Sequence, residues 1–447
     1  MHTPIVDFLK KYQKDNKVRF HVPGHKGKGP LGCEALDITE VKGADSLYEA
    51  DGIIAESEQN AASLFGSQRT CYSTEGSSQC VRAMLYLAIN NRPGDGGRPL
   101  IVAARNVHKS FVHAAALLDF DIEWLWPEHS RSLCDCRISS STLESVLKRL
   151  PYPPAAVYLT SPDYLGGMAD IQTMAELCHR YGTILIVDNA HGAYLRFLSP
   201  SQHPLDFGAD LCCDSAHKTL PVLTGGAYLH VSRRLDAKYA FQAKSALEIF
   251  GSTSPSYLTL ASLDYCNALL DGEYPALIAE QVLRMEAFKT YLRQKQWQIE
   301  DSDPLRLTIG IPKELGGIEF AQRLCRDGIE CEYAEPSFAV FMTTPENNAD
   351  DLQRLATVLG ENLFLTLLPD IRMLTPPRKA LSVRQALFSP HETVPAKKAL
   401  NRICGLPAVS CPPAVPIVMP GEQINAEALQ LFHYYGIQNV SVLKQKK

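Results

Sequence analysis

The sequence predicts an α/β protein with a mainly parallel sheet covered by helices on both faces, followed by a smaller α/β domain. Short apolar runs rich in β-branched residues begin near residues 69, 100, 155, 183 and 210, and helical stretches separate them. Strands that alternate with helices are typical of parallel sheets joined by right-handed crossovers. Two of these runs end on polar residues, at Asp188 and in the stretch 214–220. Because open α/β sheets bind ligands at the carboxyl ends of their strands, we expect the site there.

The chain divides into three predicted parts. Residues 1–50 form an arm, in which His21-Val-Pro-Gly-His-Lys-Gly27 is too rich in turn residues for regular structure. Residues 51–295 form the large domain. Residues 296–447 form the small domain, whose prolines cluster from residue 375 onward and predict a final segment of loops and short helices.

The large domain opens with a helix over Ile53–Phe65, which Gly66 ends. A short strand, Arg69–Tyr72, then leads through a hydroxyl-rich turn into an apolar helix that continues to about Ile89. A strand, a turn and a helix N-terminus together offer backbone N–H groups and hydroxyls to a phosphate. The alternative is a plain serine cap of the helix. The candidate phosphate-binding residues are Thr74, Glu75, Gly76, Ser77 and Ser78, and the Glu75 carboxylate would repel a phosphate unless it points away.

Further strands are predicted at Leu100–Ala103, Ala155–Leu159, Thr183–Val187 and Gly226–Val231, with another within residues 206–213. A helix over Asp170–Tyr181 precedes the strand that ends on Asp188. In the small domain we expect strands at Leu305–Gly310, Cys331–Tyr333 and Phe338–Met342, and helices at Leu315–Gly328 and Asp350–Leu359. The long helix Tyr274–Leu292 links the two domains.

Asp188 and Lys218 together indicate a cofactor. A lysine can form a Schiff base with an aldehyde, and an aspartate can keep a pyridine nitrogen protonated, so that the ring becomes an electron sink. Pyridoxal 5′-phosphate (PLP) needs both groups. Alone, either residue has an ordinary interpretation as a helix cap or a solvated loop lysine. Their occurrence at two strand ends favours PLP.

The composition and charge of the chain limit the classes of binding partner that we expect. The chain has 447 residues, a formal net charge of −5 and a pI near 6.2, with no long basic run, so we expect neither nucleic acid nor an anionic membrane. No window approaches the roughly 20 apolar residues of a membrane span. The N-terminus lacks the features of a secretory signal. Thirteen scattered cysteines without zinc-site spacing predict reduced thiols, no metal and a cytoplasmic protein.

Six short motifs give further information about the function. They are His21-Val-Pro-Gly-His-Lys-Gly27, Arg105-Asn-Val-His-Lys-Ser110, Asp188-Asn-Ala-His-Gly192, Ser215-Ala-His-Lys-Thr-Leu220, Thr253-Ser-Pro-Ser-Tyr257 and Pro420-Gly-Glu422. In this order they resemble the bacterial ornithine/lysine/arginine decarboxylase family, over almost the whole chain. The resemblance implies a PLP enzyme of fold type I that converts lysine, ornithine or arginine to the amine and CO₂, a step of polyamine biosynthesis.

The resemblance also implies roles for single residues. Lys218 would hold the cofactor above Asp188, and His108 would stack on its ring, although His108 has an alternative interpretation as the cap of a helix that begins at Ser110. Ser215 would contact the phosphate, and His191 would support the aspartate or the ring. Either Lys218 or His217 would return a proton to Cα.

The family further implies a homodimer in which Thr253 and Ser254 reach the neighbouring subunit's phosphate; the alternative is a hydroxyl-rich helix start. The chain departs from the family pattern at Asp163, Gly225, Leu406 and Cys411. Asp163 has two interpretations, contact with a cationic substrate or the start of a turn. The departures leave the amino-acid substrate open, and with it two alternative functions: another PLP reaction, such as that of an aminotransferase or lyase, and a catalytically silent regulatory homologue.

Overall fold

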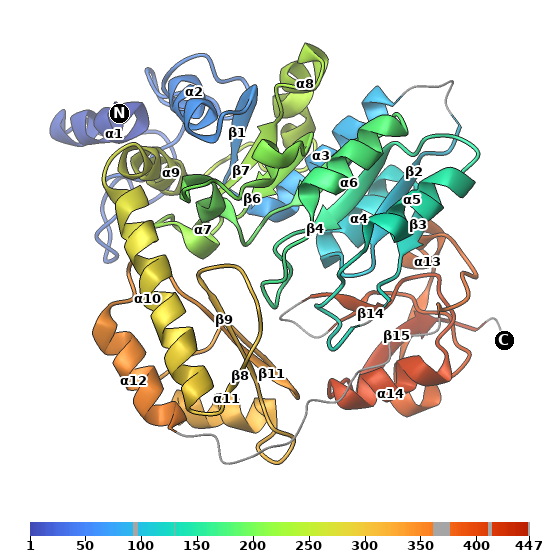
Figure 1. Ribbon diagram of the computed structural model, residues 1–447. Coiled ribbons are helices and arrows are strands. Elements are labelled where there is room, and N and C mark those ends of the chain that lie inside the picture. Colours follow the sequence, from blue (N-terminus) through green and yellow to red (C-terminus); the bar gives the residue numbers. More distant parts are fainter. Residues whose placement is uncertain (93–96, 129, 361–375, 410–413, 446–447) are drawn as a thin grey trace. The chain divides into compact units, whose positions relative to one another are not determined.

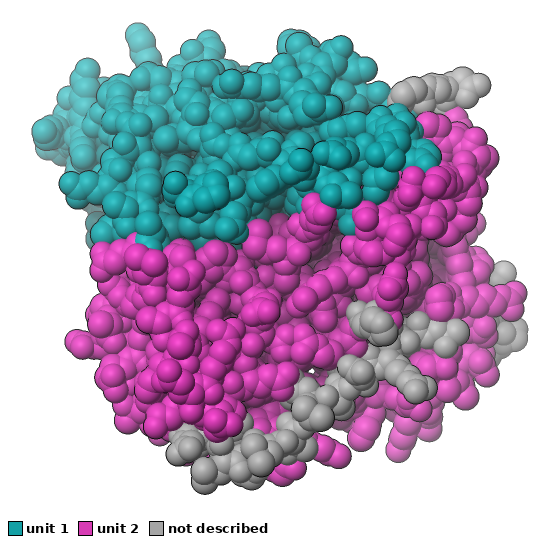
Figure 2. Space-filling model, in the orientation of Figure 1, with its two compact units in different colours: residues 1–93, 171–279 teal, residues 94–170, 280–447 magenta. Residues whose placement is uncertain are grey.

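The computed structural model describes residues 1–447 except 93–96, 129, 361–375, 410–413 and 446–447. The chain forms two compact units, each made of two segments (Figure 2). Unit 1 comprises Met1–Pro93 and Ile171–Ala279, and unit 2 comprises Gly94–Asp170 and Glu280–Lys447. Among the described residues, no helix combines the length and apolar character of a membrane span.

Among its described residues, unit 1 carries four strands in the order β1-β7-β6-β5. Figure 1 labels β1, β7 and β6, which lie side by side. Its strands are β1 Arg69–Ser73, β5 Ile184–Asp188, β6 Leu211–Asp214 and β7 Ala227–Val231. Its helices are α1 Pro4–Lys14, α2 Ile53–Phe65, α3 Ser77–Asn91, α6 Ile171–Arg180, α7 Ala216–Thr219, α8 Ala237–Glu248 and α9 Tyr257–Leu270, with 3₁₀ turns η1 Ala193–Phe197 and η2 Pro204–Phe207. The predicted helix Ile53–Phe65 is confirmed, and Gly66 ends it in the left-handed conformation, with φ 69°.

The pairing of β5 with β6 positions the candidate site. These strands run parallel, with Val187 opposite Cys212 and Asp188 opposite Cys213. All residues of β6 and β7, and all but the first of β5, are buried. Because successive side chains of a strand point to opposite faces, both faces of this sheet are covered. The parallel register brings the carboxyl ends of β5 and β6 to the same edge, as the sequence predicted.

Unit 2 contains three strands in the order β4-β2-β3 and several smaller antiparallel sheets. Its strands are β2 Leu100–Ala104, β3 Asp121–Leu125, β4 Ala156–Thr160, β8 Gln298–Ile299, β9 Arg306–Gly310, β10 Tyr333–Glu335, β11 Phe338–Met342, β12 His391–Pro395, β13 Ala408–Val409, β14 Pro416–Val418 and β15 Asn439–Leu443. Its helices are α4 Lys109–Leu118, α5 Ser140–Arg149, α11 Gly317–Arg326, α12 Ala349–Leu359, α13 Val383–Leu387 and α14 Ala426–Tyr434, with 3₁₀ turn η3 Ala396–Lys398; α10 Tyr274–Gln294 contains the boundary between the units.

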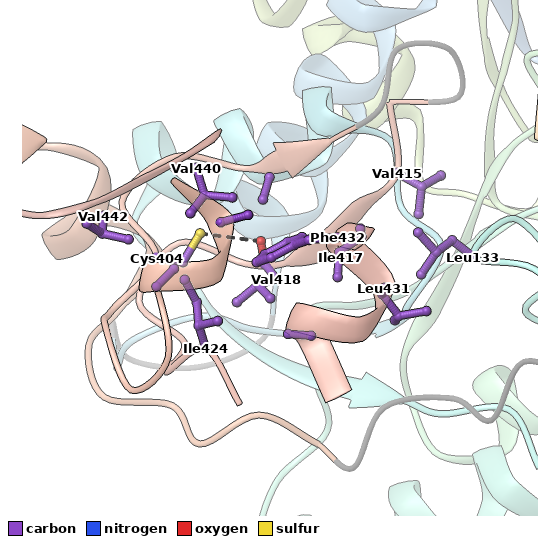
Figure 3. Close-up of a cluster of buried hydrophobic side chains, with 14 residues drawn as sticks. Leu133, Cys404, Val415, Ile417, Val418, Ile424, Leu431, Phe432, Val440 and Val442 are labelled. Carbon is purple, nitrogen blue, oxygen red and sulfur yellow. Dashed lines mark hydrogen bonds between the residues drawn. The ribbon is translucent and has the colours of Figure 1, made fainter. Parts of the chain in front are cut away.

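The C-terminal segment is more regular than expected. Instead of only loops and short helices, β12 pairs with β15 and β13 pairs with β14, both antiparallel, while α14 forms a nine-residue helix. Figure 3 shows the apolar core that these elements share, which includes Ile417, Phe432 and Val442. β12 and β15 were missed because they pair across a long stretch of sequence, and β13 and β14 because they are only two and three residues long. Local pattern does not reveal such a pairing.

Candidate active site

The structure brings Lys218 to the turn that follows Asp188. Lys218 lies on α7, directly after β6, and its Nζ is 2.7 Å from Nε2 of His191. Asp188 is buried at the end of β5, where its Oδ1 accepts the N–H of Ala190 at 3.2 Å and lies 3.6 Å from the Cys213 sulfur. An amine and a carboxylate therefore sit at adjacent strand ends, and His191 accepts a hydrogen bond from the lysine ammonium.

Ser215 and His217 flank the lysine. Ser215 is buried at the N-cap of α7, with its Oγ 3.5 Å from Nδ1 of His217. The same Nδ1 lies 3.1 Å from the carbonyl oxygen of Gly226. Because a carbonyl oxygen only accepts, Nδ1 carries the proton and the neutral ring keeps its lone pair on Nε2. His217 is thus held in one tautomer beside Lys218.

The predicted phosphate loop is also in unit 1. α3 begins at Ser77, and its N-cap is Gly76 with φ 73°, so that no side chain caps the first turn. The Glu75 carboxylate is exposed and accepts the backbone N–H of Ser252 at 2.5 Å. The carboxylate is therefore directed at the 252 segment. The hydroxyls of Thr74, Ser77 and Ser78 are partly buried around the turn.

Gly225 joins this loop to the lysine loop. The Gly76 N–H donates to the Gly225 carbonyl oxygen at 2.7 Å. Gly225 has φ +94°, and a Cβ at this position would lie 2.6 Å from the Thr74 carbonyl oxygen. A larger residue at position 225 would therefore have to displace backbone. This close approach gives the physical reason for one of the departures seen in the sequence.

Three more of the predicted residues are His108, which is in unit 2, and Thr253 and Ser254, which are in unit 1. His108 belongs to unit 2, where its side chain caps α4 by accepting the Ser110 N–H at 3.2 Å, as the alternative interpretation proposed. Its stacking on a cofactor ring stays a prediction. Thr253 and Ser254 are exposed in the segment whose Ser252 bonds Glu75. Their contact with a neighbouring subunit likewise stays a prediction.

Asp163 is buried and closes a turn. Its Oδ1 accepts the Gly167 N–H at 2.8 Å, and its backbone N–H donates to the Gly167 carbonyl oxygen at 2.8 Å. Burial, reinforced by the charge of Asp135, raises the pKa of Asp163 to about 7. Of the two interpretations of Asp163, its hydrogen bonds to Gly167 agree with the start of a turn. Among the other departures, Leu406 is 41% exposed and Cys411 lies outside the described residues.

Two of the sequence motifs, the one that begins at Arg105 and the one that ends at Glu422, are in contact, which the sequence did not indicate. Arg105 and Glu422 are buried in unit 2 and form an ion pair, with 3.0 Å between Nη2 and Oε2. The guanidinium lies over the rings of Trp124 and Trp126, 5.0 and 5.2 Å from their centroids. Since Arg105 opens the segment that carries His108, the C-terminal motif helps to hold that segment.

The residues of unit 1 fit PLP. The amine of Lys218, the carboxylate of Asp188 and the uncapped N-terminus of α3 match the aldehyde, pyridine nitrogen and phosphate of that cofactor. The hydrogen bond between Gly76 and Gly225 links the phosphate side of the site to the lysine side. Cys212 and Cys213, on the strand that precedes Lys218, do not compete as nucleophiles, because burial raises the pKa of both thiols.

Comparison with known proteins agrees with this geometry. Residues 3–313 match the family model for the Orn/Lys/Arg decarboxylase major domain, and residues 361–441 match its C-terminal domain. An arginine decarboxylase of Bacillus subtilis is 31% identical over 472 residues, which cover 95% of this chain and 92% of that protein.

Solved structures show the same fold. The lysine decarboxylase of Francisella novicida superposes with a TM-score of 0.81 at 17% identity, covering 99% of this chain and 81% of that one. The constitutive lysine decarboxylase of Escherichia coli gives 0.78 at 19% identity, covering 99% and 82%. The predicted fold class, that of PLP-dependent enzymes of fold type I, is confirmed. The chain belongs to the Orn/Lys/Arg decarboxylase family.

Proposed function

We propose that this protein is a PLP-dependent decarboxylase that converts a basic amino acid to its amine and CO₂, with arginine as the first substrate to test. The observation that carries the proposal is the 2.7 Å contact between Lys218 Nζ and His191 Nε2, in the turn that Asp188 opens. Family membership and the naming of the Bacillus subtilis relative as an arginine decarboxylase support it. The amine product belongs to polyamine biosynthesis.

Each side chain of the site has a defined task. Bound PLP supplies the electron sink for the electron pair that departing CO₂ leaves on Cα. Lys218 holds the cofactor, and Asp188 holds a proton on the pyridine nitrogen. The first turn of α3, with Thr74, Ser77 and Ser78, binds the phosphate through N–H groups and hydroxyls.

Neighbouring residues orient these groups and move the proton. His191 accepts a hydrogen bond from Lys218 and so aims the amine at the Asp188 turn. His217 has its Nδ1–H on the Gly226 carbonyl oxygen, which leaves Nε2 as the atom that exchanges a proton. Either this nitrogen or the Lys218 amine returns the proton to Cα. Ser215 contacts the phosphate from the N-cap of α7, and His108 contributes ring stacking.

A homodimer completes the proposal. Val18, Phe20 and Leu31 of the N-terminal arm are 81–94% exposed, an unusual exposure for large apolar side chains outside an interface. A second copy of the chain would bury them. Thr253 and Ser254, which are exposed, would then reach the phosphate of the partner's site.

Turnover by the PLP-loaded protein tests this function. Arginine, lysine, ornithine and the remaining amino acids are incubated separately, and CO₂ and amine are measured. We expect release of both from a basic amino acid, and none from Lys218→Ala. Borohydride reduction followed by peptide mapping should place the cofactor on Lys218. A keto acid product would instead indicate an aminotransferase, and cofactor binding without turnover of any amino acid would indicate a silent homologue.

A further inference from the structure

A fully buried charged cluster lies behind the candidate site in unit 1, and the mechanism above does not use it. Asp214 ends β6, one residue before Ser215, and its carboxylate is 0% exposed. Its Oδ2 lies 3.0 Å from Nε2 of His203 and 3.1 Å from Nε2 of His230, and both rings are also 0% exposed. Its Oδ1 accepts the side-chain N–H of Asn189 at 2.6 Å. Three N–H donors thus converge on one carboxylate, and the Cys212 sulfur lies 3.9 Å from its Oδ1.

The proton positions of the two histidines follow from their other partners. The backbone N–H of Leu205 donates to Nδ1 of His203 at 3.3 Å, so Nδ1 is an acceptor and the proton of the neutral ring is on Nε2. Nδ1 of His230 is 2.8 Å from the Thr70 hydroxyl. Burial lowers the pKa of His230, which favours the neutral ring, and because a carboxylate oxygen only accepts, the proton on Nε2 is donated to Asp214. Both rings therefore donate to Asp214.

The positions of these protons distinguish the cluster from a metal site. The three ligand atoms lie within 4.8 Å of one another, as metal ligands would. A metal ion needs a lone pair on each imidazole nitrogen that it contacts, and Nε2 of His203 carries a proton instead. Although burial opposes ionisation, the two histidines hold the pKa of Asp214 below its usual range. The cluster is a buried carboxylate anion that accepts hydrogen bonds from three N–H groups.

Asn189 connects this anion to the cofactor-binding turn. Its backbone N–H donates to Cys213, and its carbonyl oxygen accepts the Gly192 N–H at 2.8 Å. A Cβ at Gly192 would lie 2.1 Å from the Asn189 Oδ1, so the amide packs tightly inside the turn. Only the amide N–H₂ can face a carboxylate without repulsion, which fixes the direction of the bond to Asp214. The Asn189 side chain therefore ties the turn that carries Asp188 and His191 to Asp214 at the end of β6, in addition to the backbone bond to Cys213.

We propose that Asp214 is a positioning residue: through Asn189 it holds Asp188 and His191 in register with Lys218. His203 and His230 keep Asp214 ionised and in place. The inference rests on the PLP assignment proposed above. Neither Asp214 nor the histidines need to touch the cofactor.

Two variants test the inference. Asp214→Asn replaces one acceptor oxygen by a donor N–H₂ that faces the N–H of His203, whose proton cannot move to Nδ1. Asn189→Ala removes only the link and leaves Asp214 with both histidines. We expect each to raise the PLP Kd about tenfold, as the loss of one charge-assisted hydrogen bond predicts, and to change the visible circular dichroism of the bound cofactor. The dichroism reports the orientation of the ring, which a general loss of stability would not change.

The matched control is Asp264→Asn, also in unit 1. Asp264 is a buried carboxylate that accepts the N–H groups of Ile5 and Val6 and the hydroxyl of Ser57, so its role is structural. This variant should lose thermal stability but keep the PLP Kd and the dichroism of the wild type. Proton NMR of the wild type should show two protected histidine Nε2–H signals, and Asn189→Ala should keep them.

Separate outcomes decide the inference and the function. Wild-type PLP affinity and dichroism in Asn189→Ala would overturn the inference even if Asp214→Asn failed to fold. Absence of the two Nε2–H signals would overturn the proton arrangement on which it depends. Failure of borohydride to label Lys218 in the wild type would instead overturn the proposed function, and the inference with it.

Discussion

Replacing Asp163 by asparagine should make the unfolding free energy of unit 2 depend less on pH. The pKa of this buried carboxyl is raised from 3.8 to about 7, first by burial and then by Asp135. Because each pKa unit is worth about 1.4 kcal/mol, the rise corresponds to about 4 kcal/mol. The pKa of Asp163 is higher in the folded than in the unfolded protein. The protonated carboxyl therefore costs no stability below about pH 4, and unfolding free energy is lost as the pH rises to 7 and the carboxyl ionises. Between pH 5 and pH 8 the loss is about 2–3 kcal/mol.

Asparagine keeps the oxygen that accepts the Gly167 N–H but has no charge. Asp163→Asn should therefore flatten the decline in unfolding free energy between pH 5 and pH 8 by about 2–3 kcal/mol. Part of the decline will remain, because Glu335 in the same unit has a pKa raised to about 7, mainly by burial. Glu335→Gln should remove that second part.

Urea unfolding followed by tryptophan fluorescence is the measurement, since all three tryptophans, at 124, 126 and 297, belong to unit 2. Asp301→Asn is the control, because the Asp301 side chain is 99% exposed. An Asp163→Asn protein with the wild-type pH profile, or one less stable than the wild type at pH 8, would refute the reasoning.

Three further predictions follow from the packing. Glu422→Gln leaves the buried Arg105 cation without its counter-ion and should lower the unfolding free energy by about 3 kcal/mol, measured by urea and fluorescence. Gly225→Ala forces a Cβ to 2.6 Å from the Thr74 carbonyl oxygen at a positive φ, and should weaken PLP binding more than tenfold in a fluorescence titration. Among the described cysteines of the native protein, a maleimide should label the exposed Cys325 first, while the buried thiols react only after unfolding, as peptide mapping would show.

Controls sharpen these tests. Gly24→Ala is the comparison for position 225, because a Cβ at Gly24 meets no atom within 4 Å; its PLP affinity should equal that of the wild type. For the ion pair, equal losses from Glu422→Gln and from the double variant Glu422→Gln with Arg105→Met would contradict a buried pair, since removing both charges should cost less than removing one. Early labelling of Cys213 would contradict the buried β6 strand.

The sequence alone determined the parts of the site that follow from local pattern. An unbroken apolar run ends on Asp188, and the next strand delivers Lys218, so the strand rule was enough to place an acid and an amine at one edge of a sheet. Helices such as α2, α6 and α12 and most strands were recognised because burial imposes a periodicity that neighbouring residues share, whereas α5, α8 and α14 were not predicted. The chemistry of these two groups was enough to propose PLP.

The tertiary structure decided whatever depends on partners distant in sequence. Asp214 lies next to a predicted motif, yet its role comes from His203, His230 and Asn189, which converge only when β5, β6 and β7 pair. The Arg105–Glu422 pair joins residues 317 positions apart. A local pattern records which face of an element is buried. It does not record what that face meets, because contact energies between distant segments leave no periodic trace in either one.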